Sequence, residues 1–165
     1  MSKVEEKLSK IGVNIPDAPT PAANYLPFTK TGNLVFVSGQ VPFVDGKLQI
    51  TGTVGIDASV EDAQGQARIC AINLLAQLKV ACSGNLDRVK QVVKLGAFVA
   101  SANDFHSQPT VVNAASDISV EEDSDHIVIS LLGSADLPYF FDSDGDDLSF
   151  AAHTSGSDLI AVMVD

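Results

Sequence analysis

The hydrophobic pattern is clearest in the segment Asn33–Pro42, where Leu, Val, Phe and Val are followed by Ser38, Gly39 and Gln40. An apolar, β-branched run between two glycines predicts a strand that is buried on both faces. Glycine at the strand end lets the backbone approach another group closely, and the flanking residues add a hydroxyl and an amide. This pattern is typical of a small-molecule pocket, although an ordinary strand and turn would look the same.

The segments around this strand predict an antiparallel meander preceded by a helix. Charged and apolar residues are interspersed in a helical pattern over Met1–Ile11, and the proline-rich stretch 16–21 must be extended. A short strand is expected over 22–30. Asp45-Gly46 predicts a tight hairpin turn before the next short strand, at 47–50.

The strongest helix prediction lies between Ser59 and Gly84. Ser59 and Asp62 form a capping-box pattern, and Gly84 follows the expected end. One apolar stripe at helical spacing is expected to pack in the core. Its members are Ala63, Ala67, Cys70, Leu74, Leu78 and Ala81.

A further strand is predicted over 91–100, and a second helix starts near Asn103 and continues through Asn113. Strands, helix, strand and helix in this order predict an α+β domain with helices on one face of an antiparallel sheet. One or two more strands should follow to complete that sheet.

Charge divides the chain sharply. Up to Ala115 there are 10 Lys and Arg against 9 Asp and Glu, a net of +1. From Ser116 onward there are 12 Asp and Glu and no Lys or Arg, so the whole net charge of -11 comes from this part. The shift predicts a boundary between a domain at 1–117 and an acidic tail at 118–165.

Composition also narrows the function classes. No basic patch is present to neutralise phosphates, so nucleic acid is not an expected partner. No apolar run approaches the roughly 20 residues of a membrane span, and no signal peptide is visible. Cys70 and Cys82 fall on one predicted helix, too far apart to bridge. Together these features predict a reduced, cytoplasmic protein without a membrane partner.

The residues over roughly 13–117 resemble the Rid/YjgF superfamily, also called the endoribonuclease L-PSP family. The resemblance is carried by Asn24-Tyr25, the run Leu34–Pro42, the alanine-rich helix, Phe98-Val99, and Asn103-Asp104-Phe105 through Asp117. It implies a chorismate-mutase-like α+β fold with two helices on one face of the sheet. It also implies a homotrimer with pockets between subunits, and no cofactor.

The resemblance further implies hydrolysis of reactive enamines and imines, such as 2-aminoacrylate, to a keto acid and ammonia. In such a pocket an arginine pairs with the substrate carboxylate, because a guanidinium binds it in a bidentate manner. By position, Tyr25 would wall the pocket, Ser38 and Gly39 would approach the substrate, and Asn113 would add a polar contact. Supporting roles are expected for Gln40, Phe98 and Phe105.

The sequence departs from the family after the second helix, where the arginine-bearing strand should follow. The chain has two arginines, Arg68 in the long helix and Arg88 before a strand, and neither is at the expected place. The deaminase activity is therefore expected to be missing or impaired, and no catalytic residue is assigned. A non-catalytic, ligand-binding trimer is the alternative. The ribonuclease name finds no support, since a histidine pair and a basic groove are both missing.

The acidic tail resembles part of a cadherin-like repeat of bacterial surface proteins. Its Asp142, Asp144 and Asp146 are weak Ca²⁺ candidates, because carboxylate oxygens are hard ligands. A Ca²⁺-binding fragment fused to the domain is therefore a further alternative, and the join could be natural or artificial. The tail could also complete the sheet, if 148–152 and 159–164 substitute for the missing final strands. Otherwise it is expected to be β-rich or poorly ordered.

Overall fold

A computed structural model describes residues 2–21, 24–116, 118 and 160–164. Its α-helices are α1 (Lys3–Lys10), α2 (Val60–Ala81) and α3 (Gln108–Ser116), with a 3-10 turn, η1 (Leu86–Arg88). Its strands are β1 (Phe28–Thr31), β2 (Leu34–Val37), β3 (Phe43–Val44), β4 (Lys47–Leu48), β5 (Val89–Lys94) and β6 (Ile160–Val164). The α+β class predicted from the order of elements is confirmed.

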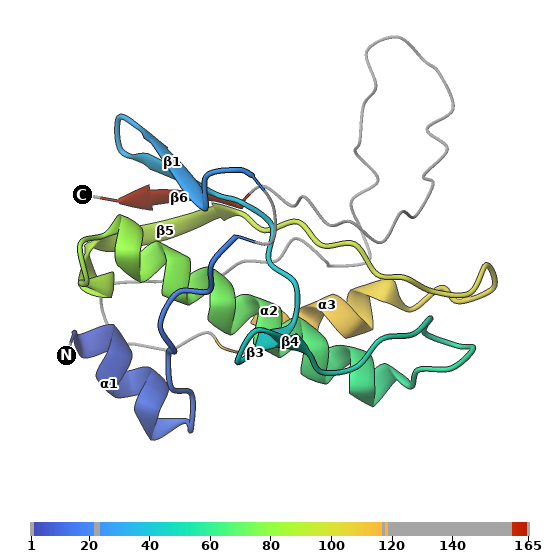
Figure 1. The fold of residues 1–165 in the computed structure, drawn as a ribbon. Coiled ribbons are helices and arrows are strands. Elements are labelled where there is room, and N and C mark those ends of the chain that lie inside the picture. The colour runs from blue at the N-terminus through green and yellow to red at the C-terminus, as the bar shows by residue number, and fades with distance from the viewer. Residues whose placement is uncertain (1, 22–23, 117, 119–159, 165) are drawn as a thin grey trace, which may run out of the picture.

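Four strands form the main sheet in the order β1-β2-β6-β5, and every neighbouring pair is antiparallel. Strand β6 therefore lies between β2 and β5, with Val162 opposite both Val35 and Val92. Figure 1 shows this sheet as one layer, with α2 lying beneath it. The segment 160–164 thus takes a central place in the sheet.

Strands β3 and β4 form a separate two-stranded hairpin. Its turn is Asp45-Gly46, where both residues have positive φ, 50° and 73°. A two-residue turn with φ > 0 at both positions matches the right-handed twist of the strands, which explains why Asp-Gly predicted the hairpin correctly.

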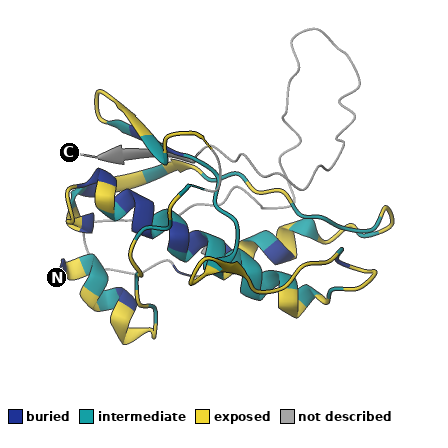
Figure 2. Ribbon diagram, in the orientation of Figure 1, coloured by how far each residue is buried: buried dark blue, intermediate teal, exposed yellow. Residues whose placement is uncertain are grey.

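The core lies between the sheet and α2. Val35 and Val37 of β2 are 0% and 1% exposed, and they pack with Leu78 and Ala81 of α2. Figure 2 shows the buried residues of α2 concentrated on the part of the helix that lies below the sheet. The region between sheet and helices is therefore the hydrophobic centre of the described chain.

The structure corrects the predicted burial of β2. Val35 and Val37 are buried, but Leu34 and Phe36 are partly exposed, so the strand is fully covered on one face only. The reason is that successive side chains point to opposite faces, and the helices of one chain cover a single face. The predicted strand over 91–100 is also corrected, because β5 begins at Val89 and ends at Lys94.

The predicted apolar stripe of α2 is only partly correct. Leu78 and Ala81 are buried, whereas Ala63 and Cys70 are partly exposed. The fully buried set also includes two amides, Asn73 and Gln77, together with Ala71 and Ala76. An apolar pattern alone cannot predict such a set, because buried amides become tolerable only when hydrogen-bonding partners reach them.

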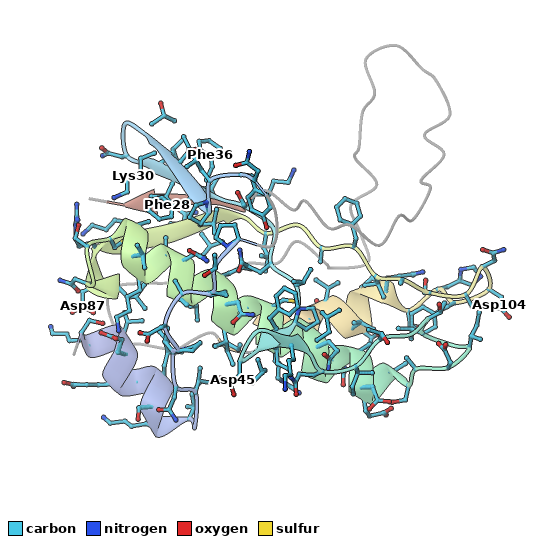
Figure 3. All side chains as sticks on the ribbon, in the orientation of Figure 1. Phe28, Lys30, Phe36, Asp45, Asp87 and Asp104 are labelled. Carbon is cyan, nitrogen blue, oxygen red and sulfur yellow. The ribbon has the colours of Figure 1, made fainter. Side chains whose placement is uncertain are left out.

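Helix α1 is attached to the rest of the domain by polar contacts at its first turn. Ser2 and Glu5 form a capping box, and the carboxylate of Asp87 in η1 accepts hydrogen bonds from the backbone N–H groups of Lys3 and Val4, both at 3.0 Å. An anionic group is favourable there because helix N-termini carry unpaired donors and a positive partial charge. Figure 3 shows Asp87 beside the start of α1.

The C-terminal end of α2 is stabilised by the positive charge of a lysine side chain. The Lys30 ammonium of β1 donates a hydrogen bond to the carbonyl oxygen of Ala81, the last residue of α2. It also lies 5.9 Å from the centre of the Phe28 ring. A positive charge at a helix C-terminus opposes the negative end of the helix dipole, so this contact holds the helix end against the edge strand.

Among the described residues, no helix is both long and apolar enough to cross a membrane. The segment 148–152 and the Ca²⁺ candidates Asp142, Asp144 and Asp146 lie outside the described residues. The division of the chain into a domain at 1–117 and a tail at 118–165 stays a prediction.

Glu5→Gln tests the contact between α1 and α2. Lys79 Nζ lies 2.5 Å from Glu5 Oε1, and this bond, with the Ser2 N–H, lowers the pKa of Glu5 from 4.5 to about 2. A lowered carboxylate pKa stabilises the fold above pH 4.5, and the contribution is lost as the pH falls from 4.5 through about 2. The substitution should cost about 1 kcal/mol at pH 7, since Lys79 is 35% exposed.

Urea unfolding between pH 3 and pH 7 measures this effect. The difference in free energy of unfolding between the wild type and Glu5→Gln should become smaller as the pH falls. Glu6→Gln makes the same chemical change at an adjacent exposed position and should shift stability by less than about 0.5 kcal/mol. A gap that does not depend on pH would contradict the assignment.

Candidate functional site

The strand end after β2 is held to the segment that precedes β1. The hydroxyl of Ser38 donates to the carbonyl of Leu26 at 2.6 Å, and the backbone N–H of Ser38 donates to the carbonyl of Pro27 at 2.9 Å. The side chain of Gln40 donates to the carbonyls of Ser38 and Gly39, at 3.0 and 3.2 Å. The Ser-Gly-Gln segment is therefore locally fixed. The supporting role in a pocket that the family resemblance implies for Gln40 stays a prediction.

The same segment is held at its other end by α2. The amide nitrogen of Asn73 donates to the carbonyls of Val41 and Phe43, at 3.1 and 3.0 Å. The Phe43 N–H also donates to the Val41 carbonyl at 2.7 Å, so the chain turns tightly around Pro42. Asn73 is 3% exposed, and its bonds satisfy a donor that burial would otherwise leave unpaired.

The aromatic residues predicted for the site differ in exposure. Tyr25 is 44% exposed and Phe98 is 68% exposed, whereas Phe105 is partly buried. Phe105 lies next to Gly55, where an added Cβ would be 3.8 Å from the Phe105 ring. Within one chain, the predicted wall residue Tyr25 and the predicted supporting residue Phe98 are therefore both exposed to solvent.

Phe105 belongs to a loop that is paired with the turn at 53–58. The Val54 N–H donates to the Ala100 carbonyl, and the Ala102 N–H donates to the Val54 carbonyl, both at 2.9 Å. Gln108, at the start of α3, donates to the Phe105 carbonyl at 2.6 Å. Figure 3 shows Asp104 at the far end of this loop, away from Phe28 and Lys30 on β1.

Asn113 lies on α3, and its side chain is exposed. The structure therefore brings the Ser38-Gly39-Gln40 segment together with Leu26 and Pro27, and it places Phe105 in a second anchored loop. A single pocket that unites these groups with Asn113 stays a prediction.

Two cations near the sheet, Lys30 and Arg88, have structural partners. Arg88 donates to the carbonyl of Cys82 at 3.4 Å, in the connection between α2 and β5. The central strand β6 has the sequence Ile-Ala-Val-Met-Val and contributes no charge. Within the described part of the chain, no group of three or more His, Cys, Asp or Glu side chains could hold a metal ion.

Sequence reasoning missed the roles of Asn73 and Gln77. Gln77 is 2% exposed and donates to the carbonyl of Pro19 at 2.6 Å, so it fixes the proline-rich stretch as Asn73 fixes the turn at Pro42. A signal was present, because two amides four residues apart interrupt the apolar stretch Ile69–Leu78 of α2 and must share one face. That spacing indicates buried amides that bind passing backbone.

The chain is similar to known proteins in both sequence and fold. The family model YjgF/chorismate mutase-like, described as "putative endoribonuclease", matches residues 5–129. This span covers most of the chain, and the chain therefore belongs to the YjgF/chorismate mutase-like family. The match also extends beyond residue 117, where the charge of the chain changes.

Two individual proteins are similar to this chain in sequence. Protein TCP17 of Trypanosoma cruzi is 38% identical over 141 residues, 83% of this chain and 87% of that protein. Protein HMF1 of Saccharomyces cerevisiae is 35% identical over 89 residues, 53% of this chain and 58% of that protein.

Two crystal structures are also similar. Atu1372 of Agrobacterium tumefaciens, a protein of unknown function, aligns with a TM-score of 0.72 and 36% identity, covering 98% of this chain and 94% of that one. A putative endoribonuclease from Shewanella oneidensis aligns with a TM-score of 0.63 and 31% identity, covering 70% and 76%. These alignments support the family fold, and none of the comparisons supports a cadherin-like tail.

Gly55→Ala tests the anchored loop beside Phe105. Gly55 has a φ of 88°, and an added Cβ would lie 3.4 Å from the Cβ of Ala102. An L-residue is strained at this φ, so the substitution should destabilise the protein by about 1–2 kcal/mol in urea unfolding.

Gly65→Ala is the matched control. Gly65 lies inside α2 and an added Cβ there meets no atom within 4 Å. Alanine should therefore stabilise the protein by about 0.5–1 kcal/mol, through its higher helix propensity. Equal effects of the two substitutions would refute the described conformation of the 53–58 turn.

Proposed function

We propose that this protein hydrolyses reactive enamines and imines to keto acids and ammonia, with an activity weakened by the loss of a carboxylate-binding arginine. Support for the reaction class comes from family membership and from the anchored Ser38-Gly39-Gln40 segment. The single observation behind the weakened activity is strand β6, which pairs in the centre of the sheet and contains no cation.

The proposed reaction needs few groups from the protein. 2-Aminoacrylate becomes the imine when its methylene carbon gains a proton and its nitrogen loses one, and water then adds to the imine carbon to give a carbinolamine. The C–N bond breaks, ammonia leaves, and pyruvate is formed. The protein's part is to hold the substrate and water in place, and backbone groups at Ser38 and Gly39 are proposed to do so.

Loss of the arginine should remove most selectivity for a carboxylate. A bidentate guanidinium–carboxylate contact is a strong charge-assisted bond, and hydrogen bonds to charged groups contribute about 1.5–3 kcal/mol. The two arginines of this chain lie on α2 and in η1. A substrate carboxylate is therefore proposed to be bound weakly, and a substrate without one should react almost as well.

A pair of substrates tests this proposal. Ammonia release should be measured with freshly generated 2-aminoacrylate and with an imine of similar size that lacks the carboxylate. The ratio of their kcat/KM values should be close to one, whereas a family member that has the arginine should prefer 2-aminoacrylate by about tenfold or more. No release above buffer with either substrate would disprove the enzymatic function. A strong preference for 2-aminoacrylate would disprove the weakened carboxylate site.

The second part of the proposal is a homotrimer with pockets between subunits. It is supported by the exposure of Phe98 (68%) and Tyr25 (44%), because large exposed aromatic side chains often mark a surface that another protein covers. A neighbouring subunit would supply that surface.

Phe98→Lys should therefore weaken assembly. The wild type should have a mass of about 52 kDa by light scattering, three times the 17.3 kDa of one chain. A buried, unpaired ammonium at an interface is costly, so the variant should dissociate to lower mass. Val80→Lys adds the same charge at another exposed apolar residue, on α2, and should leave the mass unchanged. A wild-type protein that elutes as a 17.3 kDa monomer would contradict the trimer.

A further inference from the structure

Helix α2 buries two amide side chains one turn apart, and each binds the backbone of a different passing segment. Asn73 binds the carbonyls of Val41 and Phe43, and Gln77 binds the carbonyl of Pro19. Both side chains are at least 97% buried. Polar groups are retained at such depth only when their hydrogen bonds are made, so each amide fixes the segment that it binds.

The bonds of Asn73 define the shape of the turn after β2. The two N–H donors of its amide match two carbonyls, one on each side of Pro42. Proline has no N–H and a fixed φ, so the turn has little backbone hydrogen bonding of its own beyond the Phe43 N–H to Val41 contact. The geometry of this turn therefore depends on a side chain from another element.

The same turn leads directly to the proposed ligand-binding backbone. At one end Ser38 is bonded to Leu26 and Pro27, and at the other end Val41 and Phe43 are bonded to Asn73. The backbone between these two anchors includes Gly39, which has no side chain to hold it in place. A shift at either anchor must therefore be taken up by the Ser-Gly-Gln backbone.

We propose that Asn73 is a positioning residue for the ligand-binding strand end, an inference that rests on the proposed function. Asn73 sets the backbone of Ser38 and Gly39 by holding the turn at Pro42. Gln77 has the same chemistry and burial, but it holds Pro19 in the segment before β1. The two amides therefore differ in what they position.

Asn73→Asp and Gln77→Glu form a matched pair for the test. Each replaces an amide nitrogen by oxygen with almost no change in volume, so each removes the donors and places an acceptor against a carbonyl. The kcat/KM for 2-aminoacrylate should fall about tenfold in Asn73→Asp, because small displacements of positioning groups are costly. It should stay within about twofold in Gln77→Glu.

Amide hydrogen exchange followed by NMR gives a readout independent of turnover. Exchange at Phe43 and Ser38 should become about tenfold faster in Asn73→Asp and remain near wild type in Gln77→Glu. Pyruvate, the reaction product, serves as the binding probe, and its shifts of the Ser38 and Gly39 amide signals should be lost only in Asn73→Asp. Asn73→Ala and Gln77→Ala, which bury no charge, replace the pair if either charged variant fails to fold.

The possible outcomes distinguish failure of the proposed enzymatic function from failure of the positioning role of Asn73. Wild-type protein that neither turns over 2-aminoacrylate nor responds to pyruvate defeats the proposed function, and the exchange pattern then still reports whether Asn73 holds the strand end. Equal losses of activity and thermal stability in both variants would overturn the inference, because Asn73 would then be structural only. Unchanged exchange at Ser38 in the Asn73 variant would overturn it as well.

Discussion

The main sheet depends on one pairing, the insertion of β6 between β2 and β5. Without Ile160–Val164, the β1-β2 hairpin and β5 would share no hydrogen bonds within the described sheet. Strand β6 supplies antiparallel partners to both sides, from Leu34–Val37 on one side to Val89–Lys94 on the other. Helix α2 can then cover a continuous surface rather than two separate strand pairs. The core and the position of the strand end after β2 both depend on the insertion of β6 into the sheet.

Much of this architecture was predictable from local patterns. The capping box at Ser59, the Asp45-Gly46 turn and the apolar run at 34–37 each specify their own conformation, and all three were predicted correctly. The partial exposure of Leu34 and Phe36 was not, because burial depends on how many layers cover the sheet. The central place of residues 160–164 was raised as a possibility by their apolar run, but strand order is a long-range property that no local pattern specifies.

The candidate site also has features that the sequence predicts and features that it does not. The polar residues Ser38 and Gln40 drew attention through their place at a strand end, and the structure shows how each is bonded. The spacing of Asn73 and Gln77 indicates buried amides, but the segment that Asn73 binds could not be predicted, because that loop lies some thirty residues earlier in the chain. Tyr25, Phe98 and Asn113 were carried over from the family resemblance. Their exposure agrees with the proposed need for a second subunit, a role that one chain's pattern cannot specify.

The central position of β6 has a consequence for synthesis of the protein. Strands β2 and β5 are both complete by Lys94, but the strand that joins them begins at Ile160, 66 residues later. At translation rates of about 5–20 residues per second, this interval lasts about 3–13 s. During that time no other described strand pairs with the facing edges of β2 and β5, and unpaired apolar edges are templates for other chains. The nascent chain is therefore most exposed to wrong strand pairing before β6 emerges from the ribosome.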